Sequence, residues 1–344
     1  MKRALPILTL GLMLSSPLSS VFAQDTGLLG GDFNIGIEGE VNAFARGSTD
    51  GQADAYLSGS YVSLSVGFKE KVRAVITTKL DSLFEDSSLS LNEQFQLGEF
   101  IKEAYIEIRD VGGKPIAMII GKQPMAFGQK VQAMPLFKNN PMQDLQEIKE
   151  VYGFTVDLQE GLFGIFDQVE ISAFESGAGD LELGKIDGLS VRLSKMLTDH
   201  WLLTASHARI GHSGTGNGAE TKTSIGLIGE TTDGFLVGWA EAILFSNNPR
   251  HQNSNFAYTI GGMIRVSETT DVVIEYNSIK NEVRELGLGV KTALTRNLSA
   301  GAEVRWIDHL SQDRSELTFG VSMTYTFGNS GRNTNEEYLF DGDE

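Results

Sequence analysis

The sequence contains no cysteine among its 344 residues. The chain therefore has no disulfide framework, no zinc–thiolate or iron–sulfur site and no cysteine nucleophile. Basic residues are also scarce, because 28 Lys and Arg stand against 45 Asp and Glu, for a formal net charge of −17. This acidic excess argues against nucleic acid as a partner, since little positive charge is present to neutralise phosphates.

Proline is rare, at 7 residues, whereas glycine is frequent, at 39. This balance indicates many tight turns and little linker. Beyond residue 23 the sequence has no run of 18 apolar residues, which excludes a transmembrane helix. Hydrophobic residues still make up 41% of the chain, which is too many for a disordered protein.

The N-terminus has the features of a secretory signal peptide. Lys2 and Arg3 form a short positive end, residues 4–14 are mostly apolar, and residues 21–23 (VFA) have the small-x-small pattern of a cleavage site. The apolar stretch is too short to span a bilayer. We therefore expect residues 1–23 to be removed on export from a bacterial cell. The remaining classes are a soluble periplasmic protein, a secreted β protein and an outer-membrane barrel.

Most of the remaining chain alternates between apolar and polar residues with a period of two. The clearest run has Leu317, Phe319, Val321 and Met323 on one phase. This pattern places apolar side chains on one face of a β-strand and polar side chains on the other. The phase is ambiguous at 200–210 and 234–245. Sixteen strands are predicted in this way, at residues 32–46, 55–69, 71–83, 100–110, 115–127, 151–159, 167–176, 184–197, 200–211, 220–231, 234–246, 255–268, 271–280, 284–296, 298–309 and 315–327.

The connectors between these strands alternate in length. Residues 198–199 and 296–297 are short turns, whereas 84–99 and 128–150 are long polar loops. Short turns at one end and long loops at the other are typical of a bacterial transmembrane barrel, which turns its apolar face to lipid. The sequence therefore predicts an all-β fold, a transmembrane antiparallel β-barrel of 16 strands with short periplasmic turns and long extracellular loops. A soluble all-β protein with alternating strands is the alternative.

Two stretches resemble outer-membrane porins. The last predicted strand ends in TYTF at 324–327, which is similar to the terminal-strand signal of outer-membrane proteins, although here an acidic tail follows. The stretch IIGKQPMAFGQ at 119–129 is similar to a glycine–basic–x–x–x–phenylalanine–glycine stretch of porins, including the phosphate-selective type. The chain also resembles the sixteen-strand porin plan in length and loop order. We therefore expect the barrel to cover residues 24–327 and the tail, 328–344, to be flexible and periplasmic.

The resemblance implies further properties. In porins the loop between the fifth and sixth strands folds into the barrel and narrows it, and the matching loop is 128–150. Its candidate constriction residues are Lys138, Asp144, Glu147 and Glu150. An ordinary surface loop or a trimer latch is the alternative, because the proline–glutamate–phenylalanine–glycine–glycine stretch of general porins is absent. The resemblance also implies a homotrimer in the outer membrane of a Gram-negative bacterium, in contact with lipid and lipopolysaccharide.

Charged residues on the polar phase are candidates for lining a pore. In a water-filled channel such charges select ions by sign, and the acidic excess predicts a mild cation preference. The alternative is that many of them pair across neighbouring strands. The candidates are Glu38, Glu40, Arg73, Lys79, Glu103, Glu107, Arg109, Asp157, Glu170, Arg192, Arg265, Glu275, Lys291, Glu303 and Arg305.

Motifs of enzyme chemistry are missing. None of the five histidines lies in a serine-hydrolase motif, and the sequence has no glycine-rich phosphate loop, HExxH or calcium loop. No enzyme activity, cofactor or metal is therefore expected. The predicted function is a porin for passive diffusion of small hydrophilic solutes and ions. The alternatives are a substrate-specific porin for a sugar, phosphate or siderophore, and a surface adhesin or structural barrel with a closed lumen.

Overall fold

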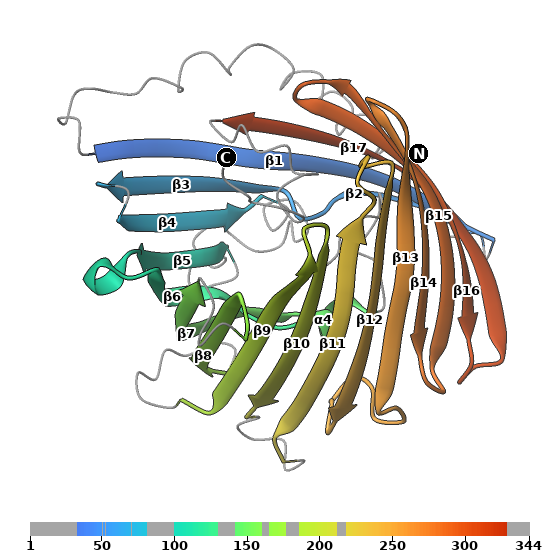
Figure 1. The fold of residues 1–344 in the computed structure, drawn as a ribbon. Helices are drawn as coiled ribbons and strands as arrows, with labels where there is room; N and C mark the ends of the chain where they lie inside the picture. The colour runs from blue at the N-terminus through green and yellow to red at the C-terminus, as the bar shows by residue number, and fades with distance from the viewer. Residues whose placement is uncertain are drawn as a thin grey trace.

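A computed structural model of the chain describes residues 33–49, 51, 53–69, 71–80, 100–129, 142–159, 165–176, 186–211 and 218–328 (Figure 1). The predicted signal peptide and residues 329–344 of the predicted tail lie outside these ranges. The described strands form one antiparallel sheet in which β1 pairs with β17, so the sheet closes into a barrel. The strands are β1 (Phe33–Ser48), β2 (Ala53–Leu57), β3 (Tyr61–Phe68), β4 (Val72–Lys79), β5 (Ile101–Ile108), β6 (Ile116–Met125), β7 (Ile148–Gln159), β8 (Gln168–Glu175), β9 (Gly188–Thr198), β10 (Trp201–Ile210), β11 (Glu220–Glu230), β12 (Leu236–Ser246), β13 (Phe256–Ser267), β14 (Thr270–Ile279), β15 (Val283–Thr295), β16 (Leu298–His309) and β17 (Arg314–Gly328).

The barrel wall has sixteen strands because β2 and β3 act as one. Both pair with β1, and the break between them lies at residues 58–60, where Gly59 has a φ of 64°. The prediction of a sixteen-strand antiparallel barrel is therefore confirmed. The connections β9–β10, β13–β14 and β15–β16 lie at one end of the barrel and span two residues each, whereas residues 247–255 connect β12 to β13 at the other end.

One face of the closed sheet is covered by exposed apolar side chains. Ile106, Ile120, Ile260 and Phe319 are 50%, 51%, 54% and 56% exposed. Soluble proteins seldom expose large apolar residues on every strand, because contact with water is unfavourable. The alternation predicted from the sequence therefore corresponds to an outer face that suits lipid, and the soluble alternative does not fit.

The seam between the first and last strands is closed by glycine–aromatic pairs. Gly39 is the register partner of Phe327, and Gly47 is the partner of Phe319. A Cβ added at Gly39 would lie 2.4 Å from Phe327 Cζ, so the ring occupies the space above the glycine. Aromatic residues stabilise strand glycines by covering them in this way. The TYTF ending of the sequence thus supplies one of the rings that close the barrel.

Within the described residues, two short helices interrupt the all-β pattern. The 3₁₀ helix η3 (Val111–Gly113) lies in the β5–β6 connection, and α4 (Gln143–Gln146) precedes β7. In Figure 1 α4 lies within the ring of strands, beside β11 and β12. The described part of the chain contains no helix with the length and apolarity needed to cross a membrane.

Candidate functional site: the barrel interior

The fifteen charged candidates occupy the barrel wall as the alternation predicts. Fourteen of them lie within strands, and Arg109 follows β5 in the connection to β6. The strand residues alternate with the exposed apolar side chains, so they lie on the opposite face, which is the interior of a closed barrel. The surroundings of thirteen of the candidates divide them into three groups.

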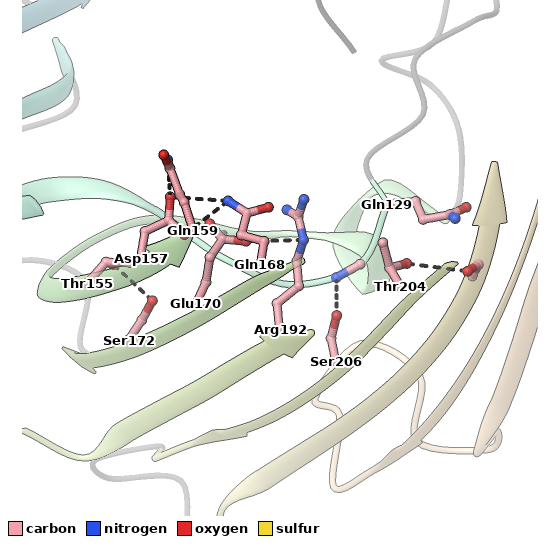
Figure 2. Close-up of polar contacts among 12 residues, drawn as sticks. Gln129, Thr155, Asp157, Gln159, Gln168, Glu170, Ser172, Arg192, Thr204 and Ser206 are labelled. Carbon is pink, nitrogen blue, oxygen red and sulfur yellow. Dashed lines mark hydrogen bonds and ion pairs between the residues drawn. The ribbon is translucent and has the colours of Figure 1, made fainter. Parts of the chain in front are cut away.

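The first group is a polar ladder across β7, β8 and β9 (Figure 2). Asp157, Glu170 and Arg192 are register partners in sequence across these strands. Glu170 Oε2 lies 3.2 Å from Arg192 Nε, and Gln168 Nε2 donates to both carboxylate oxygens of Asp157 at 3.1 Å. These contacts fit the alternative in which interior charges pair across neighbouring strands.

The second group is a buried network on β14, β15 and β16. Arg305 Nη1 donates to Glu285 Oε1 at 2.8 Å, and its Nε donates to Glu303 Oε1 at 2.6 Å. Asn277 Nδ2 joins Glu275 to Glu285, at 2.9 and 3.2 Å. Each of these five residues is at most 8% exposed. The candidates Glu275, Glu303 and Arg305 thus contact one another here, and Glu285 joins them although it was not a candidate.

The third group keeps partial exposure. It lies on β1, β4, β5 and β15, which share one side of the closed strand order. Within it Arg73 and Glu107 are register partners, and Lys291 is the register partner of Asp271 on the neighbouring strand β14. Four acids and three bases make up the group: Glu38, Glu40, Glu103, Glu107, Arg73, Lys79 and Lys291. Arg265, on β13, is the remaining strand candidate, and its Nε lies 3.8 Å from Asp271 Oδ1.

The opposite side of the interior also holds a packed apolar cluster. The described flanks of the β6–β7 connection, residues 126–129 and 142–147, lie against the inner faces of β8, β10 and β12–β14. Phe127, Met142 and Leu145 are 0% exposed. Their neighbours in this apolar cluster are Met125, Ile148, Phe174, Ala208, Ile210, Ile243, Phe245, Ala257 and Ile279. The alternation of the sequence did not reveal that this part of the interior is apolar.

The constriction candidates lie in or next to this connection. Lys138 lies outside the described residues. Asp144 lies in α4 and Glu150 lies in β7, and the structure describes the backbone of these two residues but not their side chains. The carbonyl oxygen of Glu147 accepts a hydrogen bond from Lys222 Nζ, on the inner face of β11, at 3.4 Å. The described flanks of the loop therefore contact the inner wall.

Sequence reasoning missed the residue that joins these flanks to the wall. Glu241 lies on the inner face of β12 and is 3% exposed. Its Oε2 accepts from Gln146 Nε2 at 2.9 Å, and its Oε1 accepts from the backbone N–H of Gln129 at 3.2 Å. Glu241 falls in the segment 234–245, whose phase was ambiguous, so the sequence did not place it inside the barrel.

No group of three or more His, Asp or Glu residues in the described part of the chain is placed to hold a metal ion. Outside the strands, Asp167 accepts hydrogen bonds from the backbone N–H of Met196 at 2.6 Å and from Lys195 Nζ at 3.0 Å. These bonds favour the charged carboxylate and lower the pKa of Asp167 below its ordinary value. They join the connection before β8 to the end of β9.

Solved structures of outer-membrane proteins share this architecture. The outer membrane channel DcaP of Acinetobacter baumannii has a TM-score of 0.62 at 12% identity, covering 86% of this chain and 98% of that one. Salmonella typhi OmpF, solved with daunomycin, has a TM-score of 0.59 at 11% identity, covering 85% and 97%. A mutant of the Rh. blastica porin has a TM-score of 0.58 at 13% identity, covering 86% and 100%.

No protein-family model and no curated protein sequence matches the chain. At 11–13% identity the structural likeness concerns the fold. The closed sheet, the apolar outer face and these neighbours lead to one conclusion. The chain has the sixteen-strand β-barrel fold of outer-membrane porins.

Proposed function

We propose that this protein is an outer-membrane porin that lets small hydrophilic solutes and ions diffuse passively, with a mild preference for cations and no enzymatic activity. The observation that carries the proposal is the partly exposed charged group on β1, β4, β5 and β15, inside a closed barrel with an apolar outer face. Charges in contact with water inside a barrel attract mobile ions. The group has four acids and three bases, so its excess favours cations.

Location and assembly extend this proposal. The predicted signal peptide supports export and cleavage after residue 23, and the neighbours are proteins of Gram-negative outer membranes. One neighbour, OmpT of Vibrio cholerae, is described in a trimer form. A homotrimer embedded in lipid and lipopolysaccharide is therefore the assembly we propose. Mass measurement of the detergent-extracted protein tests it, and a monomer contradicts it.

Planar bilayer recording tests the channel. We expect stepwise conductance that rises in proportion to salt concentration, with a reversal potential in a KCl gradient displaced toward the potassium equilibrium potential. A refolded barrel that inserts without conducting supports the closed-lumen alternative instead. Displacement toward the chloride equilibrium potential contradicts the cation preference.

The packed apolar cluster favours a second candidate, a substrate-specific porin. The flanks of the β6–β7 connection and the cluster beneath them occupy the side of the interior formed by β6–β14, which leaves less of the barrel's cross-section for water. A narrow passage discriminates among solutes more strongly than a wide one. Saturable block of the ion current by a single solute distinguishes this candidate from a general pore.

A further inference from the structure

One buried carboxylate bonds to both flanks of the β6–β7 connection. Glu241 Oε2 accepts from the side chain of Gln146 in α4, and Glu241 Oε1 accepts from the backbone of Gln129, which follows β6. A third bond, from Ser224 Oγ at 2.7 Å, fixes the carboxylate to the neighbouring strand β11. No basic side chain among the described residues forms an ion pair with Glu241. The hydrogen bonds from Gln146, Gln129 and Ser224 therefore provide polar partners for both oxygens of this buried carboxyl group.

The wall around Glu241 is shaped to receive the flank at residues 128–129. Gly128 has a φ of 63°, and a Cβ there would lie 2.8 Å from Glu241 Oε1 and 2.9 Å from the carbonyl oxygen of Gln146. The side chain of Gln129 lies over Gly226 of β11, where a Cβ would come within 2.4 Å of Gln129 Cδ. Only glycine leaves enough room at both contacts.

A further bond holds the same flank. The backbone N–H of Gly128 donates to Ser206 Oγ, on the inner face of β10, at 3.1 Å (Figure 2). The flank at 128–129 thus has polar contacts with β10, β11 and β12, whereas the flank at 142–147 has apolar contacts, the bond from Gln146 and the bond that Lys222 Nζ donates to the carbonyl oxygen of Glu147. Apolar packing has no preferred direction, and a helix as short as α4 has little stability of its own. The bond from Gln146 to Glu241, within α4, and the bond from Lys222 to Glu147, directly after α4, therefore fix where α4 lies.

We propose that Glu241 is a positioning residue that holds both flanks of the β6–β7 connection against the wall and so keeps the current path of the pore open. The conduction part of this proposal rests on the proposed function, and the anchoring part does not. Loss of the carboxylate leaves the donors of Gln129 and Gln146 without their acceptor, so the flanks detach and α4 moves into the interior.

A thiol reporter tests the anchoring without any conductance measurement. Because the chain has no cysteine, the substitution Leu145→Cys places a single thiol in α4, at a residue that is 0% exposed. We expect the addition of Glu241→Ala to speed alkylation of this thiol by a soluble maleimide at least tenfold. Glu241→Gln keeps one acceptor oxygen and is expected to have a smaller effect, and it replaces the alanine variant if that variant does not fold.

The matched control is Thr259→Val. Thr259 is the register partner of Glu241 on β13, is 3% exposed, and has a hydroxyl without a hydrogen-bond partner. We expect that adding Thr259→Val to Leu145→Cys leaves the alkylation rate of the thiol unchanged. Equal alkylation rates with and without Glu241 overturn the anchoring role, as does acceleration of the same size in the Thr259 variant.

Bilayer recording then tests conduction. Channels of Glu241→Ala are expected to close repeatedly at voltages that leave wild-type and Thr259→Val channels open. Faster alkylation with unchanged closures overturns the conduction part of the proposal. If the wild-type barrel does not conduct, but Glu241→Ala still speeds alkylation of the Leu145→Cys thiol, the proposed function is rejected and the anchoring role is supported.

Discussion

At the scale of single residues, the charged side chains inside the barrel differ in how far they are buried. The alternation of apolar and polar residues along a strand cannot distinguish these cases. Glu303 and Arg305 are 8% and 2% exposed and bond to each other, whereas Glu38 and Arg73 keep partial exposure. All four occupy the same phase of the alternation. The pattern assigns a face of the sheet, but water reaches only the parts of the interior that no other side chain covers. Their different environments therefore depend on which side chains cover them inside the barrel.

Asp167 gives a prediction about pH. Its bonds to Met196 and Lys195 lower its pKa in the folded protein, so the ionised form stabilises the fold above the unfolded pKa, and this stabilisation is lost as pH falls through the folded value. We expect the pKa of its carboxyl group, measured by NMR in detergent, to lie below 3.8, the ordinary value for aspartate. We also expect Asp167→Asn to lower the thermal midpoint more at pH 7 than at pH 2.

Asp54 provides a comparison for this measurement. It lies in β2, opposite Arg46, at 3.6 Å between Oδ2 and Nη2, and its side chain is 58% exposed. An exposed pair of this kind contributes little to stability. Asp54→Asn is therefore expected to change the thermal midpoint less than Asp167→Asn at pH 7. An Asp167 midpoint at or above 3.8 contradicts the prediction.

At the scale of strands, the ambiguous segment at 234–245 has large apolar residues on both faces. In β12 the exposed Leu244 faces outward, while Ile243 and Phe245, at 0% and 4% exposure, face inward and join the apolar cluster. The ambiguity at 234–245 therefore has a physical cause, because lipid lies on one face and packed protein on the other. A strand with two apolar faces in a barrel indicates an interior that is filled at that place.

The seam between β1 and β17 gives a prediction about strands. Gly39→Ala brings a Cβ to 2.4 Å from Phe327 Cζ and 2.7 Å from the carbonyl oxygen of Tyr61. The backbone oxygen cannot move away easily, so we expect the barrel to lose about 1–3 kcal/mol of stability, the usual cost of overpacking. Urea unfolding in detergent, followed by the mobility of unheated samples on gels, measures this loss.

Gly262→Ala is the matched control for the seam. Gly262 lies within β13, and a Cβ there would be no closer than 3.5 Å to any neighbour, the carbonyl oxygen of Val237. That distance is an ordinary contact, so the substitution is expected to leave the urea midpoint within experimental error. Equal losses in the two variants indicate a general effect of replacing strand glycines, and the seam explanation then fails.

For the whole molecule, the two sides of the interior differ in chemistry. The side formed by β6–β14 holds the packed flanks and the apolar cluster, and the side with β15, β1, β4 and β5 holds the partly exposed charges. An ion path along the second side passes near Glu38 and Glu40 of β1. The acidic excess there is the basis of the proposed cation preference.

Charge reversal tests this arrangement. We expect Glu38→Lys combined with Glu40→Lys to move the reversal potential in a KCl gradient toward that of chloride, because fixed positive charge along the path attracts anions. Glu268→Lys, which alters an exposed residue in the β13–β14 turn, controls for total charge. A double variant with unchanged selectivity places the ion path elsewhere in the barrel.

The sequence by itself determined the strand number, the approximate position of each strand and, outside 200–210 and 234–245, the face that meets lipid, because alternation with a period of two and the positions of turns are local properties of the chain. Predicted strands such as 220–231 and 298–309 correspond closely to Glu220–Glu230 and Leu298–His309. Only the tertiary structure decided which interior positions are packed, paired or open. Glu241 meets Gln129 and Gln146 only when the sheet closes and brings distant strands around a common interior.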